Sequence, residues 1–243
     1  MASPRVQQIL LEVLTDPPGR TSTAEQILQR LCTALIAALP VDGAGMALMT
    51  AAGHAGLLVA SDEPAAAMED LQQTLGEGPC LEASRAGRPV LLPDLVQAGT
   101  TRWPAFTMSA ADAGIAAVFA FPLQVGAIRL GVLDLYRSTT GSLDRLELAE
   151  ALDFAAAATT ILLELQHGTP IGQLHPLLAD AADGRREIHQ ATGMVSIQAA
   201  IGLTEALLVL RARAYSTGRP LLDIASDVVH RRLNFPPDSD NDE

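Results

Sequence analysis

The strongest constraint on the fold is a group of five short apolar segments between two stretches with helical periodicity. The segments are rich in Gly, Val and Leu, and each has the length of a single strand. They cover residues 44–50, 56–61, 89–93, 116–123 and 127–136. The last two are separated by Gln124, Val125 and Gly126, a connection short enough for a hairpin. The pattern predicts a mostly antiparallel sheet.

Helical patterns precede and follow these segments. Apolar residues recur at helical spacing over residues 5–15 and 23–39, and prolines end both patterns. A long helix is predicted to begin at Ser142, a good cap residue, and to end near residue 166. Its apolar stripe is spaced as in a coiled-coil seam and consists of Leu148, Leu152, Ala155, Thr159 and Leu162. Glycine and proline predict a loop at residues 75–80, and a short helix with connections is expected within residues 100–114.

The last quarter of the chain is helical in pattern. Three short apolar stripes occur between residues 188 and 229, separated by Gly202 and Gly218, and they can bury one another as a three-helix unit. The sequence therefore predicts five parts. These are a lead-in helix (1–20), an α/β domain (21–167), a linker (168–184), a helical unit (185–235) and a disordered acidic tail (236–243).

Composition limits the class of protein. The chain has 243 residues, 49% of them hydrophobic, so it can bury a core and is not disordered as a whole. Its two cysteines, Cys32 and Cys80, exclude a disulfide scaffold and a cysteine-rich zinc site. Because no continuous apolar run marks an export signal or a membrane helix, we expect a soluble protein of the reducing cytoplasm.

The distribution of charge distinguishes the helical unit from the rest of the chain. All 16 basic residues are arginine, and 28 acidic residues give a net charge of -12, which disfavours nucleic-acid binding by the chain as a whole. Residues 185–232, however, contain seven arginines and four acidic residues, a local charge of +3. A basic island between acidic flanks indicates a separate binding module, although an exposed helical bundle also carries such a charge without a partner.

Two sets of motifs resemble known families. LGEGPCLEASRAGRPVLLPDL (75–95), RWPAF (102–106) and FAFPLQVGAIRLGVLDLYR (119–137), followed by a long helix, resemble the GAF domains of actinobacterial regulators over residues 21–167. The segment IHQATGMVSIQAAIGLTEALLVLRARAYSTGRPLLDIASDVVHRRL (188–233) resembles the ANTAR domain, the RNA-binding module of transcription antiterminators. The resemblance implies an α/β GAF sensory domain, with a mostly antiparallel sheet flanked by helices, followed by a small all-α three-helix ANTAR domain. It also implies a homodimer, which the stripe from Leu148 to Leu162 would support.

The ANTAR resemblance assigns RNA binding to the helical unit. Arginine suits this role because its planar guanidinium stacks on bases and pairs with phosphate. The expected RNA-binding residues are Arg185, Arg186, Gln190, Ala191, Thr192, Gly193, Arg211, Arg213, Arg219, Arg231 and Arg232. The chain departs from the family at Thr192, where ANTAR domains usually carry a basic residue, and at Leu207, where they usually carry an aromatic one. Loss of a cation at position 192 weakens phosphate contact, and Arg185 and Arg186 are placed to compensate.

The GAF resemblance implies a small-molecule ligand. GAF domains commonly enclose a ligand between the sheet and its covering loops, in the concave and mostly apolar kind of site that suits small molecules. The large residues of this part of the chain either line such a site or fill the core; they are Trp103, Phe106, Met108, Phe119 and Phe121. No metal and no cofactor are expected, because the five histidines have no metal-ligand spacing with acids or cysteines.

Cys80 carries the one enzymatic alternative. It follows a Gly-Pro turn, and a helix N-terminus at that place lowers the pKa of a thiol. A few GAF-fold proteins reduce methionine sulfoxide, but they use additional cysteines to resolve the intermediate. Cys80 is therefore predicted to be a buried structural cysteine, and no enzymatic activity is expected.

Together the patterns and the resemblance predict a transcription antitermination regulator. Its GAF domain would control the binding of RNA hairpins by its ANTAR domain. A ligand-responsive protein-interaction module that binds no RNA is the alternative, and three short helices are also compatible with DNA binding.

Overall fold

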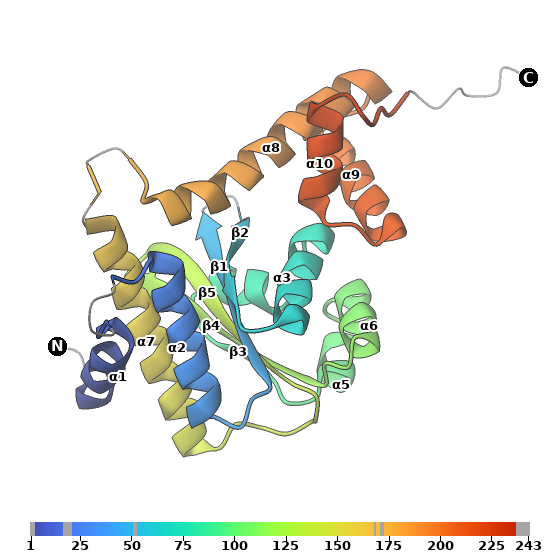
Figure 1. The fold of residues 1–243 in the computed structure, drawn as a ribbon. Helices are drawn as coiled ribbons and strands as arrows, with labels where there is room; N and C mark the ends of the chain where they lie inside the picture. The colour runs from blue at the N-terminus through green and yellow to red at the C-terminus, as the bar shows by residue number, and fades with distance from the viewer. Residues whose placement is uncertain (1–2, 17–20, 51–52, 168, 171–172, 237–243) are drawn as a thin grey trace, which may run out of the picture.

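A five-stranded antiparallel sheet forms the centre of the protein. The computed structural model describes residues 3–16, 21–50, 53–167, 169–170 and 173–236. The strands are β1 (Gly43–Thr50), β2 (Gly53–Ala60), β3 (Val90–Leu92), β4 (Ala117–Val125) and β5 (Ile128–Arg137), in the order β2-β1-β5-β4-β3 (Figure 1). All four neighbouring pairs are antiparallel, which confirms the predicted sheet. Val125 pairs with Ile128, so the hairpin turns at Gly126 and Ala127, and Gly126 has the positive φ of 58° that such a turn requires.

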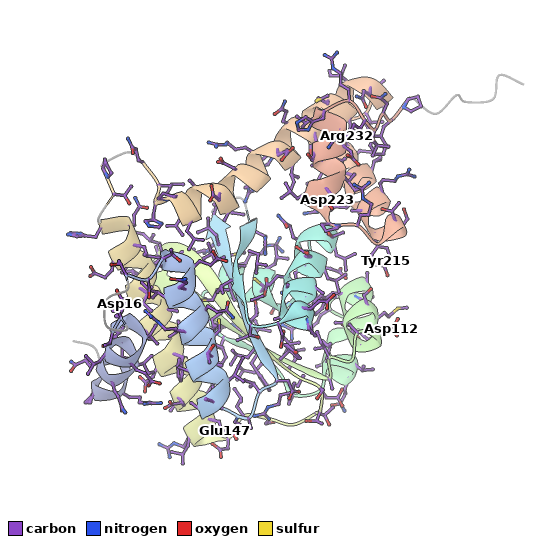
Figure 2. The ribbon with its side chains drawn as sticks, in the orientation of Figure 1. Asp16, Asp112, Glu147, Tyr215, Asp223 and Arg232 are labelled. Atoms are coloured by element: carbon purple, nitrogen blue, oxygen red, sulfur yellow. The ribbon has the colours of Figure 1, made fainter. Side chains whose placement is uncertain are left out.

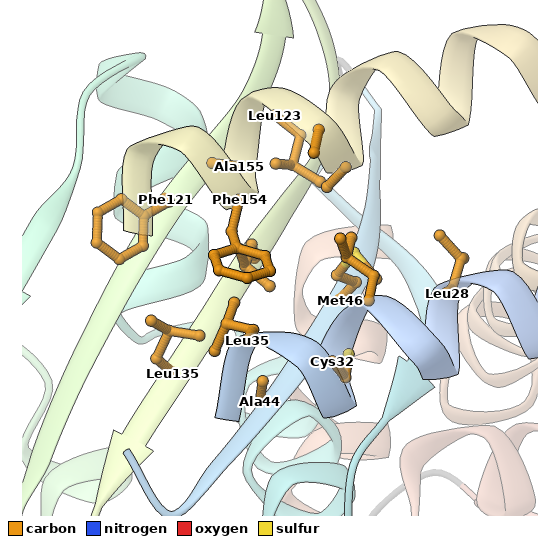
Figure 3. Packing of buried hydrophobic residues seen from close by; sticks show 14 of the residues in the cluster. Leu28, Cys32, Leu35, Ala44, Met46, Phe121, Leu123, Leu135, Phe154 and Ala155 are labelled. Atoms are coloured by element: carbon orange, nitrogen blue, oxygen red, sulfur yellow. The ribbon is translucent and has the colours of Figure 1, made fainter. Parts of the chain in front are cut away.

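Three helices cover one face of the sheet. They are α1 (Pro4–Leu14), α2 (Ala24–Ala38) and α7 (Arg145–His167), which lie together in Figure 1. Phe121, Leu35 and Phe154 meet in the hydrophobic core of this face (Figure 3). The predicted lead-in helix belongs to this core, because Val6 is buried in it and Arg5 pairs with Glu150 of α7. We call this side of the sheet the apolar face.

Four helices cover the opposite face. They are α3 (Glu63–Leu75), α4 (Pro79–Ala86), α5 (Leu95–Gly99) and α6 (Pro104–Asp112). The predicted loop at residues 75–80 is shorter than expected, because α3 extends to Leu75 and α4 begins at Pro79. Gly76 ends α3 in a left-handed conformation with φ of 69°, which glycine adopts without steric cost.

The C-terminal helices form a second, smaller core. They are α8 (Pro176–Ala199), α9 (Leu203–Thr217) and α10 (Leu221–Val229), and their buried residues include Val195, Leu210 and Ile224. The three helices contain the apolar stripes predicted between residues 188 and 229. The second half of the predicted linker (168–184) is helical, because α8 begins at Pro176. Residues 168 and 171–172 of this linker lie outside the described part of the chain. The predicted acidic tail also lies outside it, apart from Pro236.

Helix α8 connects the two cores. Its first turns pack on the sheet domain, where Leu178 is buried in the apolar core. A Cβ atom on Gly56 of β2 would lie 2.6 Å from the carbonyl oxygen of Ala181, so the α8 backbone rests directly on β2. Its last turns contribute Ala191 and Val195 to the core of the helical unit. One helix is therefore part of both domains.

Most residues of the stripe predicted to form a dimer seam pack against other elements of the same chain. Ala155 and Leu162 of α7 are buried in the apolar core, whereas Leu152 is 46% exposed. The buried members leave little of a continuous seam for a partner. Among the described residues, no single helix has the length and apolar character to cross a membrane; α8 and α9 meet that test only as a pair bent by 104°.

Candidate functional site

A cluster of buried polar side chains lies on the face of the sheet that α3 and α4 cover. His54 comes from β2, Asp134 from β5, Glu69 from α3 and Cys80 from the first turn of α4. Glu69, Cys80 and Asp134 are completely buried, and His54 is only 9% exposed. We call these four residues the polar cluster. Four elements that are distant in sequence are needed to assemble it.

The backbone around the cluster holds its members in place. Gly45 of β1 pairs with Asp134 of β5, and the Glu69 side chain lies over Gly45, 3.4 Å from where a Cβ would stand. The backbone N–H of Cys80 donates to Gln72 Oε1 at 2.8 Å. Gly78, with φ of 136°, passes so close to this amide that a Cβ there would lie 2.5 Å from the same oxygen. The Gly-Pro sequence before α4 thus allows Gln72 to position Cys80.

Several polar atoms of the cluster have no hydrogen-bond partner among the described residues. These atoms are Glu69 Oε1, both carboxylate oxygens of Asp134 and His54 Nδ1. His54 Nε2 and Glu69 Oε2 are in contact at 3.4 Å, which is longer than a good hydrogen bond. Buried polar groups are normally hydrogen-bonded, and here the carboxyl groups of Glu69 and Asp134 and the thiol of Cys80 interact chiefly with one another. Two carboxylates cannot bond to each other unless they share a proton or a cation.

Burial dominates the electrostatics of the cluster. It raises the pKa of Glu69 to about 7 and lowers the pKa of His54 to about 4. Burial, followed by the negative charge of Glu69, also raises the pKa of Asp134 well above its ordinary value. The pKa of the Cys80 thiol is raised as well, by burial and then by the charges of Asp134 and Glu69. The enzymatic alternative required a helix N-terminus to lower the pKa of Cys80, but desolvation is the larger effect and raises it; Cys80 is buried, as predicted.

A cleft separates this part of the sheet domain from the helical unit. It has a volume of about 140 Å³, and its lining includes His54, Gln72, Arg185, His189 and Arg211. The guanidinium of Arg185 donates to Thr50 Oγ1 at 2.6 Å and to the backbone oxygen of His54 at 3.2 Å. Arg211 lies so close to Gly76 that a Cβ on that glycine would clash with the guanidinium. Arg185 and Arg211, two of the seven arginines predicted to bind RNA, thus face the sheet domain.

The other predicted arginines are on or near the outer surface of the helical unit. Arg186 pairs with Asp183, while Arg219 and Arg232 share Asp227. Arg213 and Arg231 are exposed and form no ion pair with any described residue. Figure 2 shows Arg232 at the end of the unit away from the sheet, and Tyr215 on the side that faces α6, where its hydroxyl lies 3.1 Å from Ser109 Oγ.

The small and polar residues predicted on α8 divide between core and surface. Ala191 is fully buried, and Thr192 is buried with its hydroxyl donating to the carbonyl oxygen of Ile188. Gln190, Gly193 and Arg231 instead line one open groove of about 510 Å³ between α8 and the end of the unit. Ala191 and Thr192 are therefore packing residues in this arrangement, and a cation at position 192 would be buried.

The five large residues predicted for a ligand site do not line one cavity. Phe119 and Phe121 point into the apolar face, whereas Trp103 and Phe106 are buried on the opposite face, and Met108 is 64% exposed. Side chains of a strand alternate between the two faces of the sheet, so positions 119 and 121 share one face and cannot reach the other. Four of these side chains fill two cores, and Met108 belongs to neither. The polar cluster, which the sequence reasoning missed, had one readable signal: an acid, Asp134, in the middle of an apolar strand.

The comparisons with known proteins agree with this architecture. A family model for the GAF domain matches residues 21–164, which is more than half of the chain. The chain belongs to the GAF domain family. GAF domains commonly bind small molecules, and the protein therefore contains a ligand-sensing type of regulatory domain. No curated protein sequence matches the chain.

Solved structures show the same fold at low sequence identity. The GAF domain of an Acinetobacter phosphoenolpyruvate-protein phosphotransferase is 11% identical, with a TM-score of 0.51 over 69% of this chain and 95% of that chain. The GAF domain of the corresponding Coxiella burnetii enzyme is 17% identical, with a TM-score of 0.50 over 67% of this chain and 93% of that chain. At these identities the likeness is one of fold.

Proposed function

We propose that the protein is a transcription antitermination regulator in which the GAF domain controls RNA-hairpin binding by an ANTAR-like helical unit, residues 185–235. The observation that carries the proposal is the division of the seven arginines. Arg185 and Arg211 are engaged by the GAF domain, while Arg213 and Arg231 are exposed and without ion pairs to described residues. If Arg185 and Arg211 leave the GAF domain, they become available to contact RNA. RNA binding by the helical unit would then depend on the state of the GAF domain.

The groove of Gln190, Gly193 and Arg231 suits a nucleic-acid contact. A Cβ on Gly193 would have no heavy atom of the described residues within 4 Å beyond its own helix backbone, so a ribose or base has room to approach α8 there. Arg231 supplies a guanidinium for phosphate pairing or base stacking. The role is one of binding without catalysis. By the same resemblance the regulator is a homodimer in the cytoplasm, and Leu146, Leu152 and Leu163 are exposed on α7 for a partner.

A gel-shift titration of the full-length protein with hairpin RNA tests the proposal. The double substitution Arg213→Ala with Arg231→Ala removes two exposed cations, so the salt dependence, the slope of log K against log salt, should fall by about 2. Arg145→Ala is the matched control, because it removes an exposed arginine from the GAF domain. Hairpin binding that is absent at all salt concentrations, or equal in the double variant and the control, would reject the role.

One observation favours the second candidate, a ligand-responsive protein-interaction module without RNA. Ile197 is 84% exposed, and together with Met194 it gives the groove an apolar part that fits a protein side chain. Crosslinking in cells followed by RNA sequencing separates the two candidates. Only the antiterminator predicts enrichment of paired hairpins upstream of genes.

A further inference from the structure

The polar cluster has too much acidity and too few partners to be an ordinary part of a core. It combines two carboxyl groups and a thiol, all fully buried, with one imidazole. Within the described part of the chain, no arginine pairs with Glu69 or Asp134, and the only ion-pair contact of Glu69 is with His54. Buried charges are stable in proteins when they are paired or when they coordinate a metal. In the metal-free protein these acidic groups are kept neutral by protons, and a metal ion is the other cation that could stabilise them, in their ionised form.

The donor set indicates which kind of cation fits. A thiolate, an imidazole and a carboxylate are the three ligand types that Zn²⁺ accepts. Mg²⁺ and Ca²⁺ instead select sets of oxygen ligands, which this cluster does not provide. The combination of sulfur, nitrogen and oxygen therefore favours a divalent transition-metal ion over the alkaline-earth ions.

The distances also suit one ion. One donor atom each from His54, Glu69 and Cys80 lies within 4.8 Å of the other two. Two nitrogen or oxygen ligands at ordinary zinc bond lengths and a tetrahedral angle are about 3.4 Å apart. His54 Nε2 and Glu69 Oε2 are 3.4 Å apart. This spacing is long for a hydrogen bond but right for two atoms that share a metal ion.

The structure also provides a support and an approach. Gln72 holds the backbone of Cys80 through a hydrogen bond, and the Asp134 carboxyl lies against both Glu69 and Cys80. His54 and Gln72 both line the cleft toward the helical unit, which brings solvent next to the cluster at these two residues.

We propose that His54, Glu69 and Cys80 bind one divalent transition-metal ion of the Zn²⁺ type, with Asp134 as the neighbouring negative charge that stabilises it. The thiol proton passes to solvent as the metal–sulfur bond forms. Three protein ligands leave one position of a tetrahedral ion for water or a small molecule. This proposal does not depend on RNA binding by the helical unit. It identifies a metal ion as a ligand of the GAF domain.

Cobalt titration of the full-length, chelator-treated protein tests the proposal. We expect one Co²⁺ per chain, a sulfur-to-cobalt charge-transfer band, displacement by Zn²⁺ and no effect of excess Mg²⁺. Cys80→Ser should abolish the band, while Cys32→Ser should retain it, because Cys32 is equally buried but lies on the apolar face. Asp134→Asn should weaken binding about 10- to 100-fold, as loss of a supporting group does.

Two results would overturn the site. One is the absence of saturable Co²⁺ or Zn²⁺ binding; the other is a charge-transfer band that persists in Cys80→Ser. If the Cys80 variant does not fold, as judged by circular dichroism, X-ray absorption of the zinc-loaded parent protein decides. One sulfur beside nitrogen and oxygen ligands supports the site, and a shell without sulfur rejects it.

Discussion

The two faces of the sheet are both covered by helices, but they bury different kinds of side chain. The face under α1, α2 and α7 has a hydrophobic core in which Cys32 lies among leucines and phenylalanines. Its buried Arg137, at the end of β5, stacks on Phe119 and pairs with Glu147 of α7. The face under α3 and α4 carries Cys80 beside two buried carboxyl groups and an imidazole. Both cysteines are fully buried, and burial raises the pKa of both thiols, that of Cys32 to about 12. Burial alone therefore does not distinguish the two cysteines, whereas their neighbours do.

The difference indicates how the domain divides its tasks. Unpaired polar atoms inside a core reduce stability, since each loses its hydrogen bonds to water. The apolar face compensates with a continuous core that also includes α1 and the start of α8. We infer that the apolar face supplies stability and that the polar face supplies the binding site. Three predictions test this division.

Phe154→Ala should have the largest effect. Phe154 is 1% exposed at the centre of the apolar face, and truncating a buried phenylalanine costs about 3–5 kcal/mol of unfolding free energy. Chemical denaturation of the metal-free protein measures this loss. Co²⁺ affinity should stay close to that of the parent at low denaturant, and a loss of stability below about 1 kcal/mol would contradict the assignment.

Zinc should stabilise the protein by an intermediate amount. A ligand that binds only the folded state at 100 times its dissociation constant contributes about 2.7 kcal/mol. For a chain of this size, that raises Tm by about 5–10 °C. Differential scanning calorimetry with and without Zn²⁺ measures the shift, and Cys80→Ser should remove it while Cys32→Ser should not. An equal shift in both cysteine variants would place zinc binding elsewhere.

Asp134→Asn should have the smallest effect, and its sign should depend on the metal. In the metal-free protein it replaces a fully buried acid, crowded by the second carboxyl group of Glu69 and without an ion pair to a described arginine, by a neutral amide, so stability should rise by about 1 kcal/mol. With zinc present the gain should disappear, because the supporting charge is lost. Denaturation curves in chelator and in zinc provide the two measurements, and destabilisation in chelator would show that Asp134 is paired in the native protein.

The contrast between the faces also explains what could be predicted from the sequence. Residues 23–39 and the five strands carry regular apolar patterns, and the structure confirms them within a few residues. Helix α3 was missed for a physical reason. Its buried positions include Ala65, Met68, Glu69 and Gln72, which have helical spacing but end in polar residues, so the apolar stripe is interrupted where the site is built.

The site itself could not be found by spacing rules. Its members lie on β2, α3, α4 and β5, and only the antiparallel order of the sheet brings these elements together. The arginine set depended on tertiary contacts in the same way. Charge identifies a basic segment, but only the packing of α8 and α9 shows that Arg185 and Arg211 face the GAF domain.

The continuity of α8 affects how the protein can be dissected. Its 24 residues extend for about 36 Å, and about 26 Å of this length separates Leu178 in one core from Val195 in the other. A truncation at residue 184 or 185, where the sequence suggests a boundary, would cut through the helix. The N-terminal fragment would keep Leu178 on a frayed end, and the C-terminal fragment would begin at the buried stripe without its preceding turns. Fragments intended to fold alone should therefore both include residues 176–199.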